Sequence, residues 1–99
     1  MIHILWEFEV QADRVDEFVQ HYSSAGVWAQ LFRKSAAYIQ TILFQDAGSP
    51  LRFVTIDVWE DQLGFENFTQ AFRSEYEALD RHCESLTKTE RFIGIFREA

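Results

Sequence analysis

The sequence predicts an α+β fold in which one antiparallel sheet carries helices on a single face, with the element order β-α-β-β-α-β. Three observations support this fold class. Four segments show the period-two alternation, or the β-branched and aromatic content, of strands. Two longer segments repeat apolar residues every three or four positions, as amphipathic helices do. A turn containing Gly and Pro separates the second and third strand segments, so these strands are expected to pair as an antiparallel hairpin.

The first strand and the first helix are predicted within residues 2–22. Apolar residues occupy every second position of residues 2–10, which is typical of a strand. Asp13 is the expected N-cap of a helix over residues 14–22, because acids fill the first turn, where the helix dipole favours them. The apolar stripe of this helix consists of Val15, Phe18, Val19 and Tyr22. A further short helical turn is expected at residues 27–32.

The middle of the chain predicts a hairpin. Residues 36–45 form the second expected strand, residues 47–50 (AGSP) the loop, and residues 51–60 the third strand. One face of the third strand carries Val54, Ile56 and Val58, whereas the other face carries Thr55, Asp57 and Trp59. An acid and an indole on the same strand face indicate that this face lines something.

The last part of the chain predicts helices and a closing strand. From Asp61 onward, apolar residues recur at helical spacing: Phe65, Phe68, Phe72, Tyr76, Leu79, Cys83 and Leu86. Ser74 and Glu77 have the S-x-x-E spacing of a capping box, so we expect a break near Ser74 and two helices. Residues 87–98 form the fourth strand. The complete order is that of the ferredoxin-like fold, the split βαβ motif.

Length, charge and cysteine content limit the class of protein. The 99 residues indicate one domain over residues 1–99. A formal net charge of −7 argues against nucleic acid and against an anionic membrane surface as partners. The apolar N-terminal segment is short and contains acids, so neither a membrane span nor a signal peptide is expected. The lone Cys83 fits a reducing, cytoplasmic location.

Both faces of the predicted sheet are apolar. Trp59, Phe53, Phe92 and Phe96 stand opposite Val54, Ile56, Ile93 and Ile95. Because the helices of this fold cover only one face, the second apolar face needs a partner. We therefore expect a homodimer in which the sheets of two copies pack face to face.

Several segments resemble the antibiotic biosynthesis monooxygenase family of dimeric α/β-barrel proteins. Taken along the chain, these segments are ILWEFEV, HYSSAG, YIQTILFQD, FVTIDVWED and FIGIF. The resemblance covers nearly the whole chain. It implies that the sheets of two subunits close a barrel around a cavity, which would explain a strand face that mixes Thr55, Asp57 and Trp59.

The resemblance also implies a choice of chemistry. Members catalyse cofactor-independent oxygenation of aromatic polyketides or quinols, and another branch degrades haem. The haem-degrading branch uses an Asn on the first strand, with a Trp and a His on the second helix. The matching positions here hold Leu5 or Trp6, Phe68 and Ala78, so haem degradation is disfavoured. No cofactor is expected, and a small aromatic molecule is the expected ligand.

Asp57 is the candidate catalytic base. A cofactor-free oxygenase needs a base that deprotonates a phenol or enol in a dry cavity, and burial on a barrel-facing strand would raise the pKa of a carboxyl group. The alternative is a structural Asp57 near a rim, paired with Arg52 or Arg91. The other candidates for the cavity are Trp6, His21, Tyr38, Thr55, Trp59, Phe68 and Phe72.

Two of these candidates also have plain structural interpretations. Trp59 either stacks on a planar ligand or belongs to the core, and His21 either reaches the cavity mouth or faces solvent. No metal site is expected, because no two histidines stand four residues apart with an acid between them. His82, next to Cys83, points to a different helical face.

The leading hypothesis is a dimeric, cofactor-independent monooxygenase that acts on a small planar aromatic or quinol-like substrate. The alternative is a dimer that binds a small ligand, or only assembles, without catalysis. The two hypotheses predict different cavities. A cavity filled by Phe and Trp side chains favours the structural role, whereas an open cavity that reaches Asp57 or Thr55 favours an enzyme.

Overall fold

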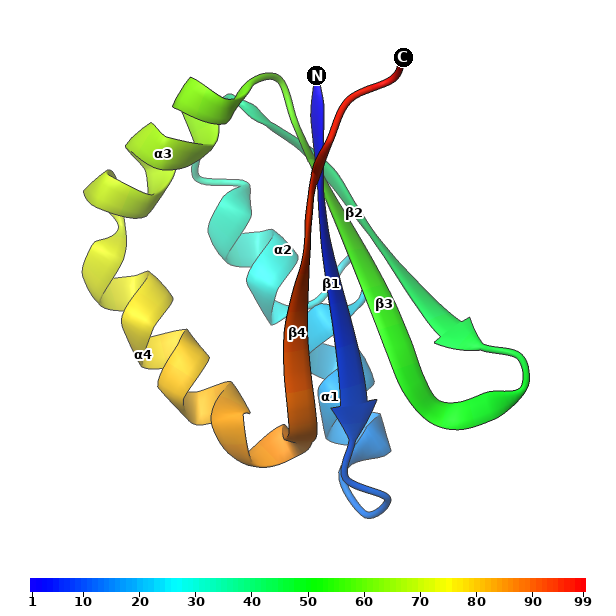
Figure 1. The fold of residues 1–99 in the computed structure, drawn as a ribbon. Coiled ribbons are helices and arrows are strands. Elements are labelled where there is room, and N and C mark those ends of the chain that lie inside the picture. The colour runs from blue at the N-terminus through cyan, green and yellow to red at the C-terminus, as the bar shows by residue number, and fades with distance from the viewer.

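A computed structural model describes residues 1–99 and confirms the predicted α+β fold (Figure 1). Along the chain the elements are β1 (Ile2–Val10), α1 (Val15–Tyr22), α2 (Val27–Phe32), β2 (Tyr38–Asp46), β3 (Ser49–Trp59), α3 (Gln62–Ala71), α4 (Arg73–Cys83), the short 3-10 helix η1 (Glu84–Leu86) and β4 (Thr87–Phe96). No helix in the structure combines the length and the hydropathy that a membrane span requires.

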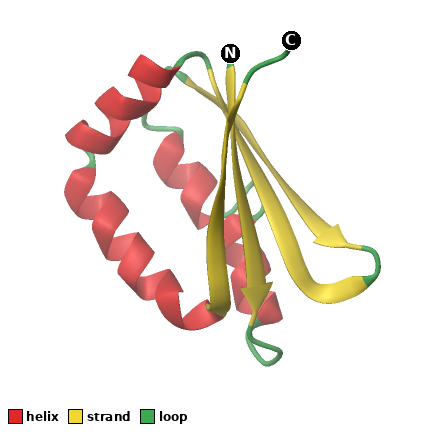
Figure 2. Cartoon of the chain, viewed as in Figure 1, coloured by secondary structure: helices red, strands yellow, loops and turns green.

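The four strands form one antiparallel sheet in the order β2-β3-β1-β4. Figure 2 shows all helices on one side of this sheet, as the ferredoxin-like order requires. We call the face toward the helices the inner face and the opposite face the outer face. The mixed strand face of β3 and the alternate residues of β1 paired with it lie on the inner face.

Aromatic side chains make up much of the core between the sheet and the helices. Trp59 is fully buried, and its ring packs edge-on against Phe32 at 5.4 Å and Phe65 at 5.2 Å between centroids. Phe18 stacks on Tyr22 at 4.3 Å and meets Phe8 of β1 at 5.2 Å. Such offset and edge-to-face pairs add to the gain from burying apolar area.

Two predicted helix caps are wrong. Helix α1 begins at Val15 without a side-chain cap, because the carbonyl of Arg14, rather than Asp13, accepts the first helical bond. The break near Ser74 falls at Phe72, whose backbone leaves helical geometry (φ −115°, ψ 31°), and no side chain caps α4. Asp61 does cap a helix: its Oδ1 accepts a hydrogen bond of 2.7 Å from the Gly64 N–H at the start of α3.

The hairpin and the last strand also depart from the sequence expectation. The turn consists of Ala47 and Gly48 only, since Ser49 pairs with Asp46 and already belongs to β3. The pairing of β4 with β1 shifts by one residue, because Leu5 pairs with Gly94 but the next residue, Trp6, pairs with Phe92. This irregularity breaks the alternation of side chains along β4. As a result, Phe92 pairs with Trp6 on the inner face, whereas Phe96 pairs with His3 on the outer face.

Gly94 lies within this β4 irregularity with φ +156°, a backbone conformation that side chains disfavour. A Cβ atom at this position would also lie 3.2 Å from the ring of Phe96. The bulge therefore depends on glycine, and it explains why a strict period of two fails in this strand.

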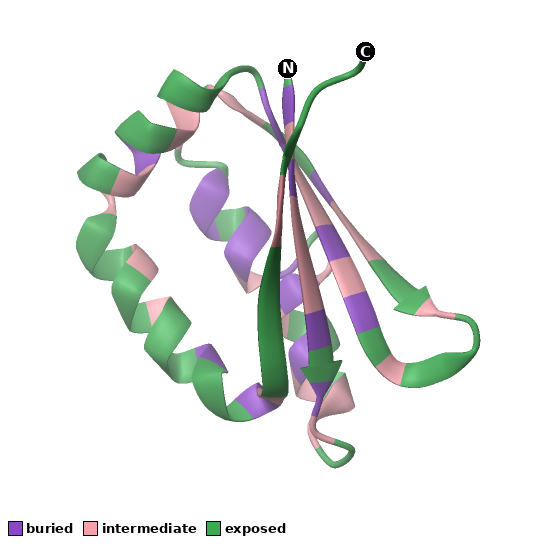
Figure 3. Cartoon of the chain, viewed as in Figure 1, coloured by how far each residue is buried: buried purple, intermediate pink, exposed green.

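The outer face of the sheet is apolar and carries no helix. Its apolar side chains are Leu5, Ile42, Phe44, Val54, Ile56, Val58 and Phe96. Phe44 is 51% exposed and Phe96 is 48% exposed. Figure 3 shows that exposure also extends along β4 and over α3 and α4. An exposed apolar sheet face of this kind is typical of an interaction surface.

Candidate functional site

A cavity of about 290 Å³ lies between the inner face of the sheet and the helices. The sheet contributes Trp6, Phe8, Thr41, Thr55, Asp57 and Glu90, and the helical layer contributes Tyr22, Trp28, Phe32, Tyr76, Asp80 and Glu84. All four strands and three of the four α-helices take part. The cavity is therefore formed within a single chain.

The position of this cavity corrects one expectation. The mixed face of β3 was expected to line a barrel closed by the sheets of two subunits. In the structure Thr55 and Asp57 instead face the chain's own helices, because they pair with the inner-face residues Trp6 and Ile4. The outer face, toward which a second sheet would pack, is the apolar one. The cavity reaches both Asp57 and Thr55, which is the arrangement that favours an enzyme.

Asp57 is held by a chain of hydroxyl groups from the neighbouring strand. The Thr41 Oγ1 hydroxyl donates to Asp57 Oδ1 at 2.7 Å, and the Tyr38 hydroxyl donates to Thr41 Oγ1 at 2.8 Å. Thr41 reaches Asp57 because the two residues are direct partners in the β2–β3 ladder. The second carboxylate oxygen, Oδ2, receives no hydrogen bond from the protein and remains available to a ligand.

Burial raises the pKa of Asp57 from its ordinary value of 3.8 to about 6, and the Thr41 hydrogen bond acts in the opposite direction. The shift arises because the protein removes water from the carboxylate and supplies no cation. The alternative in which Asp57 pairs with Arg52 or Arg91 is wrong. Both arginines instead bind Glu7 on the outer face, Arg91 Nη2 at 2.9 Å from Oε1.

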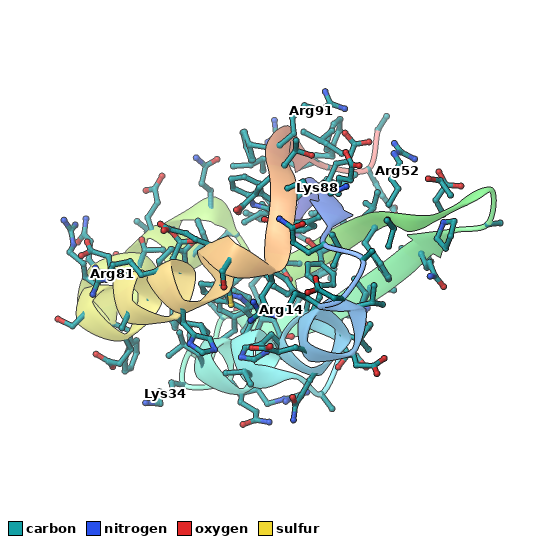
Figure 4. All side chains as sticks on the ribbon, turned by 90° about the horizontal axis from the view of Figure 1, so that it is seen from below. Arg14, Lys34, Arg52, Arg81, Lys88 and Arg91 are labelled. Atoms are coloured by element: carbon teal, nitrogen blue, oxygen red, sulfur yellow. The ribbon has the colours of Figure 1, made fainter.

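The lysine and arginine side chains lie outside the lining of the cavity. Figure 4 shows Arg52 and Arg91 at the sheet, away from Lys34 and Arg81 at the helical layer. The hydrogen bonds of Arg52, and then of Arg91, hold the pKa of Glu7 below its ordinary value. No lysine or arginine lines the cavity, so Asp57 keeps its raised pKa.

Three exposed carboxylates form the rim of the cavity: Asp80, Glu84 and Glu90. Desolvation and then the charges of Asp80 and Glu84 raise the pKa of Glu90. Burial likewise raises the pKa of Tyr76 to about 12 and raises that of Tyr22. The two phenols of the wall therefore stay neutral at physiological pH and keep a hydroxyl proton that can be donated.

Of the other residues that were predicted to line the cavity, some do so and others lie in the core or outside it. Trp6 lines the cavity, whereas Tyr38 acts on it indirectly through Thr41. Trp59 and Phe68 are buried in the core, and Phe72 packs against that core beneath the ammonium of Lys34, 5.5 Å from its ring centre. His21 does not line the cavity, although the next residue, Tyr22, does.

Several lining residues were missed by sequence reasoning. Tyr76, Asp80 and Glu84 follow one another at four-residue intervals, so helical spacing alone could have placed them on one face. Thr41 could not be found in this way. Its pairing with Asp57 depends on a register shift between Gln45 and Asp46 that the sequence does not reveal.

A second cluster lies outside the cavity. His21 of α1 and His82 of α4 stand with ring centroids 5.2 Å apart, and potential ligand atoms of these two residues and Glu17 lie within 4.8 Å of one another. The expectation that the histidines form no metal set considered only spacing within one helix. The tertiary fold brings them together with an acid.

The topology and the cavity define a ferredoxin-like α+β protein with an aromatic chamber under its helices. A model of the antibiotic biosynthesis monooxygenase family matches residues 1–86. The chain therefore belongs to the antibiotic biosynthesis monooxygenase family. A search of curated proteins gives no match.

Solved structures share the same fold at low sequence identity. A candidate antibiotic biosynthesis monooxygenase from Deinococcus radiodurans is 14% identical with a TM-score of 0.76, covering 100% of this chain and 93% of that one. A similar protein from Nitrosomonas europaea is 14% identical with a TM-score of 0.71, covering 99% and 98%. SnoaB, a cofactor-independent oxygenase from Streptomyces nogalater, is 19% identical with a TM-score of 0.66, covering 99% and 92%.

Proposed function

We propose that this protein is a cofactor-independent monooxygenase that acts on a small planar aromatic or quinol-like substrate. The observation that carries the proposal is Asp57, a carboxyl group with a pKa raised to about 6 and one free oxygen in an aromatic cavity. A base whose pKa lies near the working pH transfers protons efficiently. Family membership and the fold shared with SnoaB support this class of reaction.

In the proposed reaction Asp57 removes a proton from a phenol or from the activated carbon of its keto form. The resulting anion gives electrons to dioxygen, and a bond forms between the substrate carbon and one oxygen atom. That atom stays in the product as a carbonyl, and the other leaves as water together with the transferred protons. Loss of the second hydrogen of the substrate as a proton breaks the O–O bond and releases water. The substrate loses two hydrogens, gains one oxygen and thereby supplies all four electrons that reduce dioxygen.

The cavity wall is suited to such an anion. Tyr22 and Tyr76 are neutral donors, and the indole N–H of Trp28 is buried without a hydrogen-bond partner in the protein. Preorganised donors in a water-poor site stabilise negative charge that develops during a reaction. The rings of Trp6 and Phe8 offer flat apolar surface for a planar substrate.

The volume of the cavity and the charge at its rim limit the class of substrate that would fit. A cavity of about 290 Å³ lies at the small end of ligand sites, which favours two or three fused rings over a large polyketide. The rim carries the carboxylates of Asp80, Glu84 and Glu90 without a basic counterpart. Repulsion at this rim disfavours substrates with a carboxylate and favours neutral ones such as naphthols and anthrones.

We also propose that the protein works as a homodimer. Members of the family typically form dimers. The apolar outer face lacks a cover within the chain, and its Phe44 and Phe96 side chains are about half exposed. A second copy of the sheet would remove this surface from water.

Aerobic incubation with a panel of naphthols and anthrones, followed by an oxygen electrode, tests the proposed reaction. Uptake should depend on one of these substrates and should rise as pH increases through about 6, where Asp57 loses its proton. Asp57→Asn should abolish uptake, whereas Asp16→Asn, an exposed acid on α1, should not. Ligand binding without uptake by the wild type across the panel would contradict the proposal and leave a binding role.

A further inference from the structure

The Glu17, His21 and His82 cluster joins two helices that are far apart in sequence. Glu17 and His21 stand four residues apart on α1, so their side chains share one face. His82 lies in the last turn of α4 and approaches them, with its Nε2 atom 3.7 Å from Glu17 Oε2. Two imidazoles and one carboxylate are a common ligand set for transition metals.

The hydrogen bonds of His21 leave one ring nitrogen ready to bind a metal. Its Nδ1 atom lies 2.8 Å from the Glu17 backbone carbonyl oxygen. A carbonyl oxygen only accepts hydrogen bonds, so Nδ1 carries the proton in the neutral ring and Nε2 presents a lone pair. Protein metal sites use this same backbone contact to orient a ligating histidine.

Glu17 is likewise oriented by a contact on its far side. Arg14 donates from Nη2 at 2.8 Å and from Nε at 3.1 Å, both to Oε1 of Glu17. The other oxygen, Oε2, is the one that faces His82. Arg14 therefore fixes the carboxylate while leaving one oxygen available for coordination.

The spacing of the three groups is close to that of a bound ion. Ligands about 2.1 Å from a tetrahedral metal lie roughly 3.4 Å from one another. One potential ligand atom of each residue lies within 4.8 Å of those of the other two, and the His82 side chain is 58% exposed and therefore able to adjust. A rotation of His82 and a small shift of Glu17 would close the remaining distance.

We propose that Glu17, His21 and His82 bind a divalent first-row transition ion such as Zn²⁺, with water completing its coordination. The ion fastens α4 to α1. This matters for the cavity, because α4 supplies Tyr76 and Asp80 to its wall, yet Cys83 is the only fully buried residue of that helix. A metal ion bound at this position would hold α4 over the cavity without taking part in the oxygenation chemistry.

Calorimetric titration of the metal-free protein with Zn²⁺ tests the proposal. The wild type should bind one ion per chain, and His21→Gln and His82→Gln should each weaken binding at least tenfold. His3→Gln is the matched control, because His3 lies on β1, where it pairs with Val58 of β3 and Phe96 of β4. Failure of the wild type to bind Zn²⁺, or equal binding by wild type and both variants, would overturn the proposal.

Thermal unfolding and cobalt substitution give independent readouts. Zn²⁺ should raise the Tm of the wild type and of His3→Gln, but not that of His82→Gln, because only a native-state site shifts the folding equilibrium. The Co²⁺ form should show d–d absorption without thiolate charge transfer. A thiolate band would assign the ion to the buried Cys83 and contradict the proposed ligands.

Discussion

The carboxyl group of Asp57 lies in an environment that favours its protonated form. Water is largely removed, and one hydroxyl group, that of Thr41, is its only protein hydrogen-bond partner. A cation next to this group would stabilise the folded chain but would lower the pKa and weaken the base. The folded protein is therefore less stable than it would be with a cation next to Asp57, the residue proposed as the catalytic base.

Asp57→Asn should stabilise the protein in a pH-dependent manner. The Asp57 carboxyl binds its proton more tightly in the folded chain (pKa about 6) than at its ordinary value of 3.8, so its ionisation opposes folding. The penalty is absent below about pH 3.8, grows up to about pH 6, and is complete above it, where it reaches about 3 kcal/mol. Asparagine removes the charge and retains an oxygen that accepts from Thr41.

Urea unfolding of wild type and Asp57→Asn at several pH values measures this effect. The variant should gain little at pH 4 and about 2 to 3 kcal/mol at pH 7.5. All other titrating groups are common to both proteins and cancel in the difference. A stability difference that stays constant over this pH range would contradict a desolvated Asp57.

At the level of single residues, the sequence predicted some of the strand residues that line the candidate cavity and missed others, among them Phe8, Thr41 and Glu90. Thr55 and Asp57 alternate along one strand, so period two suffices to place them on one face, whereas the face on which Trp6 lies depends on the register between β1 and β3. Trp59 has the same alternation but lies deeper, under Phe65 and Phe68. Alternation gives the face of a side chain but not its depth, which depends on the helices packed above it.

At the level of elements, the starts of α1 and α3 show that a residue of the right type does not always cap a helix. Both Asp13 and Asp61 precede an amphipathic segment and have the residue type that an N-cap requires. Only Asp61 makes the capping bond, because its backbone is extended (φ −158°, ψ 170°) and directs the side chain back to Gly64. Cap identity therefore depends on backbone geometry that residue type does not determine.

This contrast gives a matched pair of variants. Asp61→Ala should lower the free energy of unfolding by about 1 kcal/mol, because the Gly64 N–H at the start of α3 loses its acceptor. Asp13→Ala should change it by less than about 0.5 kcal/mol, since Asp13 caps no helix. Urea denaturation of both variants decides the matter, and equal losses would show that the cap assignment is wrong.

The type of each element, helix or strand, was easier to predict than the turns, breaks and bulges that connect or interrupt the elements. Apolar patterns predicted the four strands and the four α-helices but not the short helix η1, and the hairpin turn, the position of the α3–α4 break and the β4 bulge differed from expectation. At the break, backbone hydrogen bonds continue on both sides of Phe72, so little in the sequence distinguishes it from a continuous helix. The bulge at Gly94 reflects one backbone conformation rather than a pattern.

At the level of the whole molecule, the two faces of the sheet differ in chemical character. The inner face holds the acid, the hydroxyl groups and the aromatic wall of the cavity. The outer face is apolar apart from groups such as Glu7 and its two arginine partners. Because the inner face and the helices of one chain supply twelve lining residues to the cavity, dimerisation is proposed to cover the outer face and to support the sheet rather than to supply lining residues.

Ile56→Glu tests that division. Ile56 lies in the middle of the outer face, paired with Leu5 on one side and Ile42 on the other. In a dimer formed through this face, glutamate would be buried without a partner, which should weaken association by about 3 kcal/mol or more, roughly 100-fold. In a free monomer the same side chain would face water and the fold should persist.

Sedimentation velocity over a range of concentrations distinguishes these outcomes. The wild type should sediment as a dimer at micromolar concentration and Ile56→Glu as a folded monomer, with unchanged circular dichroism. Leu63→Glu is the control, because Leu63 is 64% exposed but lies on α3, on the opposite side of the sheet. A monomeric wild type, or dimers of equal affinity in both variants, would exclude the outer face as the interface. If the monomeric variant still takes up oxygen, each chain contains a complete active site.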